Sequence, residues 1–476
     1  MVSDTTPSRH DRLLFVSLFL FEASLLVIFL ALEVKGETHI DLFLSTRPGL
    51  AFLCAGMGFL VAGAVLIYLY LASRRSPSRN FRLIVGMNLV TVLLILVVGE
   101  MVVRVGARTY LDGEAFGNVA LKPKAWDRTV RHYRHVIEKA SDDLSYLVYD
   151  DGMGWSVGTN GRSANGLYLS SPRGVRALRE GVAFTMDEGK TNIVLVGDSY
   201  TFGEEVRYEE SWGYYVDQLL GEQVQVLNLG VPGYGVDQAY LRYERDANHW
   251  KPKVSIFGLF SHDLLRTMTV YPFLANPQWE MPFSKPRFIL ADGTLERMNE
   301  PPLRPEAIFS PPSIFDLPYL ELDRGYEKSN WQHSFYHASY LFRLLVSLFP
   351  SWSAEPLGFS EDVMVSINAA IMTSYVRAAA LEGTIPLVVY LPGRWELERS
   401  SSSPTVAERV LHEADIGYID PTSCLLEVDP ADRYMPGGHY TPTGNAAVAK
   451  CLFPVIQEAL AQAAVGQDPA LADRSP

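Results

Sequence analysis

NIVLV at residues 192–196, followed at once by GDSYTFG at residues 197–203, is the stretch that decides the fold of this 476-residue chain. The first five residues form a short, continuous apolar run, which is the pattern of a strand buried on both faces of a sheet. The glycine and the polar residues after it predict a turn, and residues 211–220 then have the pattern of a helix. A serine on such a strand-to-helix turn, here Ser199, can expose its hydroxyl and aim its own amide at a developing oxyanion.

The alternation of strand and helix continues toward the end of the chain. Strands that alternate with helices predict an α/β fold with a parallel sheet covered on both faces. A long insertion at about 267–357, rich in proline and aromatic residues, separates the third and fourth strands, and insertions of this length are usually lids or small subdomains. The expected strands are 192–196, 224–229, 254–260, 386–391 and 416–420, and the expected helices are 126–140, 211–220, 237–248, 361–383 and 444–463.

Three apolar segments precede residue 104, at Leu13–Leu32, Leu50–Ala72 and Leu83–Val103. Each is long enough to cross a hydrocarbon core of about 30 Å as a helix. The first is too long for a signal peptide and has no clean small-x-small cleavage site after it, so we expect a retained helix. The expected organisation is an anchor of three transmembrane helices at 1–104, a connecting region at 105–190, an α/β domain at 191–465 and a flexible tail at 466–476.

The basic residues of the short loops predict the orientation in the membrane. The loop at 74–82, between the second and third apolar segments, carries four arginines, whereas the first loop carries few basic residues. Positive loops stay in the cytoplasm, so everything after about Arg104 is expected outside it. Of the carboxylates inside these segments, Glu100 lies one helical turn before Arg104 and is expected to pair with it, while Glu22 has no partner in the sequence and is a candidate contact for another membrane protein.

Composition excludes some functions and leaves the cysteines open. The formal net charge is −13, which argues against nucleic acid as a partner because phosphate binding needs a basic surface. The three cysteines lack the spacing of a zinc site, and no cofactor or metal is expected. Cys424 and Cys451 either pair in an oxidising compartment or remain two buried free thiols.

Three further blocks of polar or glycine-rich residues accompany the GDSYTFG turn. In open parallel sheets, ligands bind at the carboxyl ends of the strands, where these turns lie. Glycines let the backbone approach a substrate closely and free an N–H donor. The blocks are NLGVPGYG at 228–235, FSHDL at 260–264 and GGHYTPTGN at 437–445.

The order and spacing of these blocks resemble the SGNH/GDSL hydrolase superfamily, over about residues 191–463. The resemblance implies a flavodoxin-like hydrolase domain, and the whole chain resembles bacterial membrane-anchored members of that group. It implies that Ser199 is the nucleophile and His439 the general base, which agrees with the need of a serine for an adjacent imidazole. It implies an oxyanion hole made by the amides of Ser199 and Gly233 with the side chain of His262, and supporting roles for Asp198, Asn228 and Asp263.

Two positions depart from the family pattern. His262 stands where the family usually has an asparagine, although a neutral imidazole N–H can also donate to an oxyanion. Pro436 and Gly437 stand where an aspartate usually orients the histidine. A backbone carbonyl, Asp432 or Asp429 are the candidates to replace it, and without a replacement the site is a Ser–His dyad.

The leading functional hypothesis is an extracytoplasmic esterase or O-acyltransferase on cell-surface carbohydrate, anchored in a bacterial inner membrane with its catalytic domain in the periplasm. The expected partners are the lipid bilayer, a carbohydrate or glycolipid substrate and, for acyl transfer, a membrane acyltransferase as donor. One alternative is a lipolytic esterase that draws its substrate from the bilayer. The other is a catalytically weak scaffold of a polysaccharide modification complex, which the missing aspartate and the asparagine-to-histidine change both favour.

Overall fold

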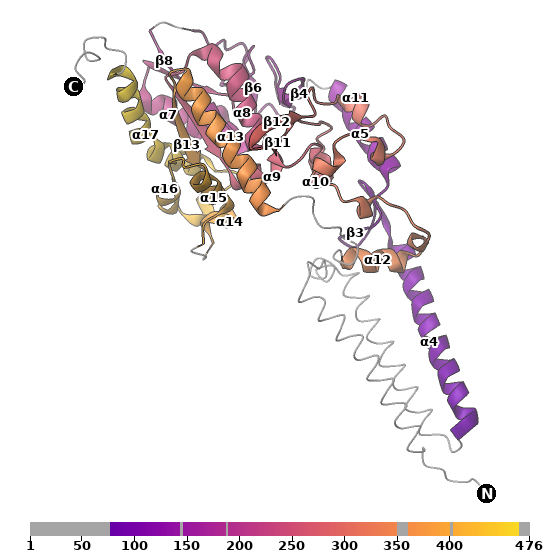
Figure 1. The fold of residues 1–476 in the computed structure, drawn as a ribbon. Helices are drawn as coiled ribbons and strands as arrows, with labels where there is room; N and C mark the ends of the chain where they lie inside the picture. The colour runs from indigo at the N-terminus through magenta and orange to yellow at the C-terminus, as the bar shows by residue number, and fades with distance from the viewer. Residues whose placement is uncertain (1–76, 143–145, 187–188, 350–359, 400–402, 466–476) are drawn as a thin grey trace. The chain divides into compact units, whose positions relative to one another are not determined.

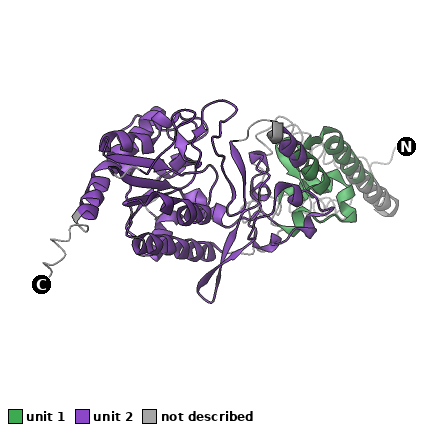
Figure 2. Ribbon diagram, turned by 90° about the horizontal axis from the view of Figure 1, so that it is seen from above, with its two compact units in different colours: residues 1–132, 327–356 green, residues 133–326, 357–476 purple. Residues whose placement is uncertain are grey.

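The computed structural model describes residues 77–142, 146–186, 189–349, 360–399 and 403–465 (Figure 1). The chain divides into two compact units (Figure 2). The first is Met1–His132 with Glu327–Pro356, and the second is Tyr133–Tyr326 with Leu357–Pro476. The expected spans 13–32 and 50–72, with Glu22, and the expected tail 466–476 lie outside the described residues.

The first unit combines a long helix with a small antiparallel sheet. Its core brings Val103 of the long helix together with Phe116, Val119 and Leu344 from the sheet and from a shorter helix. The strands are in the order β1-β2-β3. The elements are α4 (Pro77–Gly106), β1 (Arg108–Tyr110), β2 (Gly113–Phe116), β3 (Val119–Leu121), the start of α5 (Trp126–Asp142) and α12 (Tyr340–Leu348).

Glu100 connects α4 to the start of α12. Its carboxylate pairs with Arg104, 2.6 Å from Nη2, as its place one turn earlier predicts. The other oxygen accepts hydrogen bonds from the Ser339 hydroxyl and from the Leu341 amide, both at 2.9 Å. Glu100 therefore also satisfies donors at the N-terminus of α12, where helix amides lack partners in the helix itself.

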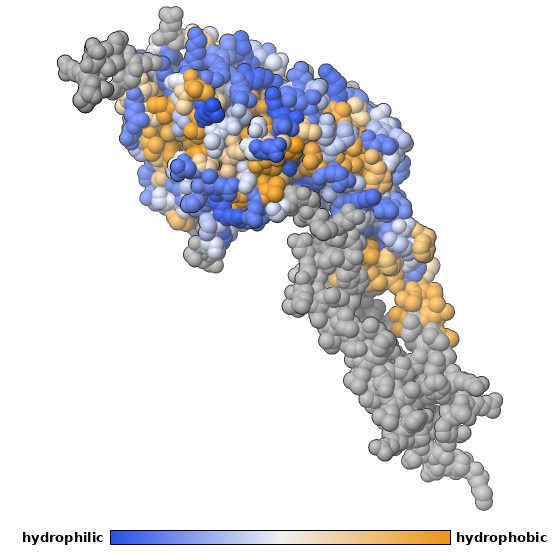
Figure 3. All heavy atoms as spheres, viewed as in Figure 1, coloured by the Kyte–Doolittle hydropathy of each residue, from blue (hydrophilic) through white to orange (hydrophobic). Residues whose placement is uncertain are grey.

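The third expected span, 83–103, lies within α4. Apolar side chains there are exposed, including Leu93 at 61% and Met101 at 53%, and Figure 3 shows apolar residues on the coloured part of this helix. Its side chains are described only at residue 90 and from 93 onward. In the described part of the chain, the single helix that is long and apolar enough to cross a membrane is α13 (Glu361–Leu381), half of which is buried in the second unit.

A four-stranded parallel sheet forms the centre of the second unit. Its order is β13-β10-β8-β9, with β8 and β10 as the inner strands. Their bounds are β8 (Thr191–Val196), β9 (Val224–Asn228), β10 (Val254–Leu259) and β13 (Ile385–Tyr390). The α/β fold with a parallel sheet is as the sequence predicts.

Alternating residues of β8 enter two different cores, which is why NIVLV is apolar throughout. Ile193 and Leu195 pack in a cluster with Trp212 and Leu452, whereas Val194 and Val196 pack in a cluster on the opposite face. The first face is covered by α7 and α17, and the second by α8 and α13 (Figure 1). A strand buried on both sides needs no polar alternation.

Helices and hairpins complete the second unit, and most expected helices are present within a few residues. The helices are α6 (Ser199–Phe202), α7 (Trp212–Leu220), α8 (Val236–Arg242), α9 (Ser261–Thr267), α10 (Pro272–Ala275), α11 (Pro305–Ile308), α13, α14 (Arg394–Leu397), α15 (Val406–Glu413), α16 (Thr422–Leu426) and α17 (Pro442–Val465). The hairpins are β4 (Leu147–Asp150) with β5 (Gly154–Val157), β6 (Leu169–Ser170) with β7 (Arg176–Ala177), and β11 (Arg287–Ala291) with β12 (Thr294–Met298).

Two expected elements differ in the structure. The strand expected at 416–420 is reduced to one isolated parallel bridge, between Val389 and Ile419. Gly417 and Pro421 flank this bridge, and glycine weakens a strand while proline has no amide to donate to the ladder. The helix expected at 237–248 ends as an α-helix at Arg242 and continues as a π turn over Tyr243–Ala247.

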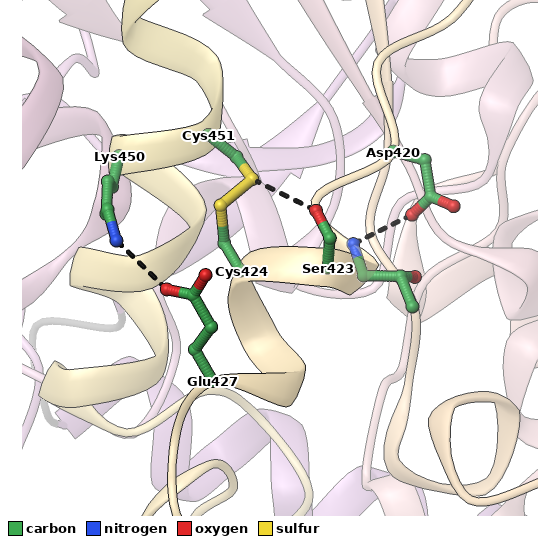
Figure 4. Close-up of a disulfide and its surroundings, with 7 residues drawn as sticks. Asp420, Ser423, Cys424, Glu427, Lys450 and Cys451 are labelled. Carbon is green, nitrogen blue, oxygen red and sulfur yellow. Dashed lines mark hydrogen bonds and ion pairs between the residues drawn. A yellow bond between two sulfur atoms is a disulfide. The ribbon is translucent and has the colours of Figure 1, made fainter.

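Cys424 of α16 and Cys451 of α17 form a disulfide, with their Cα atoms 6.1 Å apart (Figure 4). This is the first of the two alternatives that the sequence left open. Beside the bond, Lys450 pairs with Glu427 at 2.9 Å, so an exposed ion pair joins the same two helices.

Candidate active site

Ser199 lies at the first position of α6, directly after β8. The Asp198 side chain caps this short helix by accepting a hydrogen bond from the Tyr200 amide at 2.8 Å. Gly197 has a φ of 154°, and a Cβ added to it would lie 2.2 Å from Thr201 Oγ1. A side chain does not fit there, so the glycine of the GDS triplet is required by the tightness of the turn.

Two buried side chains hold this turn in place. Asn228, at the end of β9, donates a hydrogen bond to the Thr201 carbonyl at 2.8 Å. Arg176 of β7, which is 1% exposed, donates to the carbonyls of Phe202, Gly203 and Val206. Burial lowers the pKa of Arg176 to about 10, so it remains a cation at neutral pH. No motif in the sequence marks Arg176 as a residue that holds this turn.

His439 lies beside the serine. Its Nε2 is 2.9 Å from Ser199 Oγ, and its Nδ1 is 2.9 Å from Glu205 Oε2. Glu205 also accepts hydrogen bonds from the amides of Gly437 at 2.9 Å and His439 at 3.1 Å. A carboxylate on Nδ1 holds the ring in the tautomer whose Nε2 can accept a proton from serine.

Glu205 takes the place that the sequence analysis left to Asp432, Asp429 or a backbone carbonyl. In the structure Asp429 instead caps a short turn by accepting from the Ala431 amide. Glu205 has a φ of 68°, a left-handed conformation that non-glycine residues seldom adopt. Strained backbone of this kind clusters at functional sites. The feature of the sequence that could have identified Glu205 is the acidic pair that directly follows GDSYTFG.

The electrostatics of the two adjacent glutamates differ. Partial burial alone would raise the pKa of Glu205, but the hydrogen bonds from His439 and Gly437 lower it below its ordinary value. Glu204 is more enclosed, and burial raises its pKa in spite of the nearby His439. Its Oε2 lies 3.5 Å from His439 Nε2, on the edge of the ring that faces Ser199.

The NLGVPGYG block forms the turn that faces the serine. Gly233 has a φ of 83°, and an added Cβ would lie 2.2 Å from the Trp279 ring. Trp155 donates a hydrogen bond to the Pro232 carbonyl at 3.1 Å and so fixes the turn from outside. Among the described residues, no hydrogen bond uses the amide of Ser199 or of Gly233. Both amides are available to an oxyanion.

His262, at the start of α9, lines the same cavity as Ser199 and Gly233. Burial, together with the positive charges of Arg266 and Arg324, lowers its pKa to about 4. The imidazole is therefore neutral above that pH and carries one N–H, which an oxyanion donor needs.

Asp198 and Asp263 both form ion pairs with Arg266, a residue that no motif in the sequence marks. Arg266 Nη1 lies 3.1 Å from Asp198 and 2.7 Å from Asp263. Burial, and then the neighbouring Asp198, raise the pKa of Asp263 well above its ordinary value. Asp198 also lies 3.1 Å from Ser199 Oγ, so this cluster borders the nucleophile directly.

Ser199 and His439 open into a cavity of about 490 Å³. Gly233 lies beside them, and the walls come from α9, from the inserted segment after it, and from Trp155 and Glu204. The wall residues are Trp155, Glu204, His262, Arg266, Thr269, Pro272, Ala275, Asn276, Trp279, Lys285 and Arg324. The insertion thus builds most of the cleft over the serine, as a lid or subdomain would.

This parallel α/β domain carries a serine at a strand-end turn beside a histidine, as the sequence blocks predict. Solved structures to which the chain is similar include proteins described as lipolytic proteins of the G-D-S-L family and as esterases. No family model and no curated protein matches this chain.

Three solved structures illustrate the likeness. A lipolytic protein of the G-D-S-L family from Desulfitobacterium hafniense is 15% identical, with a TM-score of 0.29, over 56% of this chain and 99% of its own. An acetylxylan esterase from Geobacillus stearothermophilus is 14% identical, with a TM-score of 0.30, over 57% and 96%. An esterase from Pseudoalteromonas sp. is 9% identical, with a TM-score of 0.31, over 57% and 100%. At these identities and TM-scores, the likeness carries no inference about the activity or the substrate of this chain.

Proposed function

We propose that this chain is a membrane-anchored, extracytoplasmic serine ester hydrolase or O-acyltransferase that acts on acyl esters of cell-surface carbohydrate. The observation that carries the proposal is the chain of contacts from Ser199 Oγ through His439 to Glu205, each 2.9 Å long, at the floor of a cleft. A serine hydroxyl is a weak nucleophile until a positioned base takes its proton.

The geometry supports a two-step acyl transfer. Ser199 Oγ attacks the acyl carbonyl while His439 Nε2 takes the hydroxyl proton, and Glu205 stabilises the resulting imidazolium. The amides of Ser199 and Gly233 and the neutral His262 stabilise the oxyanion. Collapse of this intermediate releases the alcohol, which receives the proton from His439. Water, or the hydroxyl of an acceptor sugar, then gives its proton to His439 and attacks the acyl-serine, which frees Ser199.

The choice between hydrolysis and transfer depends on whether water is excluded from the acyl-serine. The ester-hydrolase half rests on the contacts of Ser199 and Glu205 with His439. The transfer half rests on one aromatic residue of the cleft wall, the partly exposed Trp279, whose ring offers an apolar face to a sugar acceptor. Transfer would require a membrane acyltransferase as donor.

Three observations support the membrane-anchored, extracytoplasmic placement. The apolar segments and the arginine-rich loop at 74–82 follow the positive-inside rule. The described part of α4 exposes apolar side chains up to the Glu100–Arg104 pair. The Cys424–Cys451 disulfide fits an oxidising compartment. A topology reporter fused after Arg104 tests the orientation: activity only outside the cytoplasm supports it, and activity only inside overturns it.

The chemistry is tested with the full-length protein in detergent, a fluorophosphonate probe and p-nitrophenyl acetate. We expect the probe to label the protein and the ester to be hydrolysed, and both signals to vanish in Ser199→Ala. Ser366→Ala is the control, because that exposed serine of α13 bonds only to Glu413 in the described structure. Absence of labelling from pH 6 to 9 would leave the scaffold alternative, and faster turnover of long acyl chains than of acetate would favour the lipolytic one.

A further inference from the structure

Three cations line the cleft over Ser199, and two of them are neutralised by carboxylates of the chain. Arg266 is shared between Asp198 and Asp263. Lys285 forms an ion pair with Asp237, both side chains being fully buried, and donates to the Pro286 carbonyl at 2.9 Å. Buried charges are normally paired in this way because an isolated ion loses its hydration.

Arg324 is the exception in the part of the chain that the structure describes. Its guanidinium has no carboxylate within ion-pair distance there, although it lines the cleft. The acid next to it in sequence, Asp323, already accepts hydrogen bonds from the amides of Val270 at 2.7 Å, Tyr271 at 2.6 Å and Gly325 at 2.7 Å. The charge of Asp323 acts on the pKa of Arg324, but no ion pair between the two side chains is present in the described residues.

The backbone that presents Arg324 is fixed. The Arg324 amide donates to the Met268 carbonyl at 2.9 Å, and Asp323 joins the same segment to the residues just after α9. The positive charge of Arg324 also acts on the reaction centre, since Arg324 and Arg266 both contribute to the lowered pKa of His262. A cation held by a rigid segment at the wall of a reaction cleft is suited to bind one part of a substrate.

We propose that Arg324 binds an anionic group, a carboxylate or a phosphate, on the same substrate whose ester Ser199 attacks. This inference rests on the proposed function and narrows its substrate class to acyl esters of acidic molecules. A guanidinium binds either anion through two parallel hydrogen bonds. The Trp279 ring, which lies against Gly233 and 5.4 Å from the Arg266 guanidinium, gives the adjoining part of such a molecule an apolar face.

Glu204 is the acid among the described residues that line the cleft, and it is not the partner of Arg324. Its nearest charged partner is His439, at 3.5 Å, and the charged groups that act on its pKa are His439, Asp198, Arg266 and Glu205 rather than Arg324.

Matched pairs of esters test the inference on the full-length protein. One pair is acetylated methyl glucoside and acetylated methyl glucuronide, which differ by a carboxylate. The other is 1-acetylglycerol and 1-acetylglycerol 3-phosphate, which distinguishes a phosphate source from a sugar acid. Each is measured with wild type, Arg324→Gln, Arg324→Lys and the control Arg297→Gln, whose arginine forms an exposed pair with Glu300.

We expect wild type to prefer the anionic member of at least one pair about tenfold or more in kcat/KM, the size of effect that a charge-assisted contact gives. Arg324→Gln should lower kcat/KM for the anionic ester more than for the neutral ester and so abolish that preference, Arg324→Lys should restore part of it, and Arg297→Gln should keep it. Equal turnover of both members by wild type, or an unchanged preference in Arg324→Gln, overturns the inference. If no ester is turned over and the fluorophosphonate does not label Ser199, the proposed function itself fails.

Discussion

The nucleophile turn at 197–205 and the histidine loop at 435–440 are joined by several hydrogen bonds but are held in different ways. The nucleophile turn is buried and is braced by Asn228 and Arg176, with Asp198 as helix cap. The histidine loop is largely at the surface, and its main contacts with the turn are the Glu205 bonds and the Tyr200 hydroxyl, which donates to the Gly438 carbonyl at 2.8 Å. The nucleophile turn is therefore part of the core, whereas the histidine loop is docked onto it.

This difference predicts that loss of a contact between the turn and the loop costs activity alone, while loss of a contact that holds the turn in the core costs activity and stability together. Glu205→Gln should break the docking most directly. Loss of the carboxylate on the histidine of a serine hydrolase costs up to about 10⁴ in rate. We expect a fall of about 10²–10⁴ in kcat for p-nitrophenyl acetate with a melting temperature close to wild type. Glu209→Gln is the matched control, and an unaltered rate in Glu205→Gln would show that the carboxylate does not orient His439.

Arg176→Ala should destabilise the nucleophile turn. It leaves the buried carbonyls of Phe202, Gly203 and Val206 without their donor, and each unsatisfied buried group costs about 1–3 kcal/mol. We expect the free energy of unfolding to fall by about 3 kcal/mol or more, and labelling of Ser199 to fall with it. A variant that melts like wild type would mean that the turn is rigid without this brace.

His262→Ala tests the third element of the site. Removal of one oxyanion donor typically costs about 10²-fold in kcat. Because its pKa is about 4, His262 stays neutral at higher pH, so the pH–rate profile of wild type should show no limb from it above about pH 5. His262→Asn should retain more activity than His262→Ala, with the same profile. Equal rates in all three proteins would exclude His262 from the oxyanion hole.

Tyr200→Phe removes the second contact between the two halves. We expect a loss of only a few fold in kcat and about 1 kcal/mol or less in stability, the net size of one neutral hydrogen bond. Activity is measured beside the thermal transition of the detergent-solubilised protein. A loss as large as that of Glu205→Gln would show that Tyr200, not Glu205, docks the loop.

The smallest expected effect is in the acid dependence of stability. A carboxylate whose pKa is lowered by folding stabilises the protein above its unfolded pKa, here near 4.5, and this contribution is lost as the pH falls through the lower folded pKa. The difference in melting temperature between wild type and Glu205→Gln should therefore shrink when the pH is lowered from 7 to below 4.5. A difference in melting temperature that does not change with pH would contradict the coupling between ionisation of Glu205 and folding.

The same comparison explains what could be predicted from the sequence. The nucleophile turn follows from local signals, since an apolar run and a GDS turn specify a buried strand and its end. The Glu205–His439 contact joins residues 234 positions apart, and no local spacing reports it. Arg176, Arg266 and Arg324 acquire their positions only when separate segments pack. The strand expected at 416–420 was wrong because its apolar residues predict pairing, whereas Gly417 and the adjoining Pro421 weaken it.

The Cys424–Cys451 bond bears on the docked half in particular, because His439 lies between the two cysteines. The histidine loop is thus enclosed in a covalent ring whose ends are 27 positions apart. By the chain-entropy relation, a ring of this size removes about 3–4 kcal/mol of freedom from the unfolded chain. The bond thus favours the folded histidine loop over its unfolded forms, whereas the nucleophile turn at 197–205 lies outside the ring and is held by packing and hydrogen bonds.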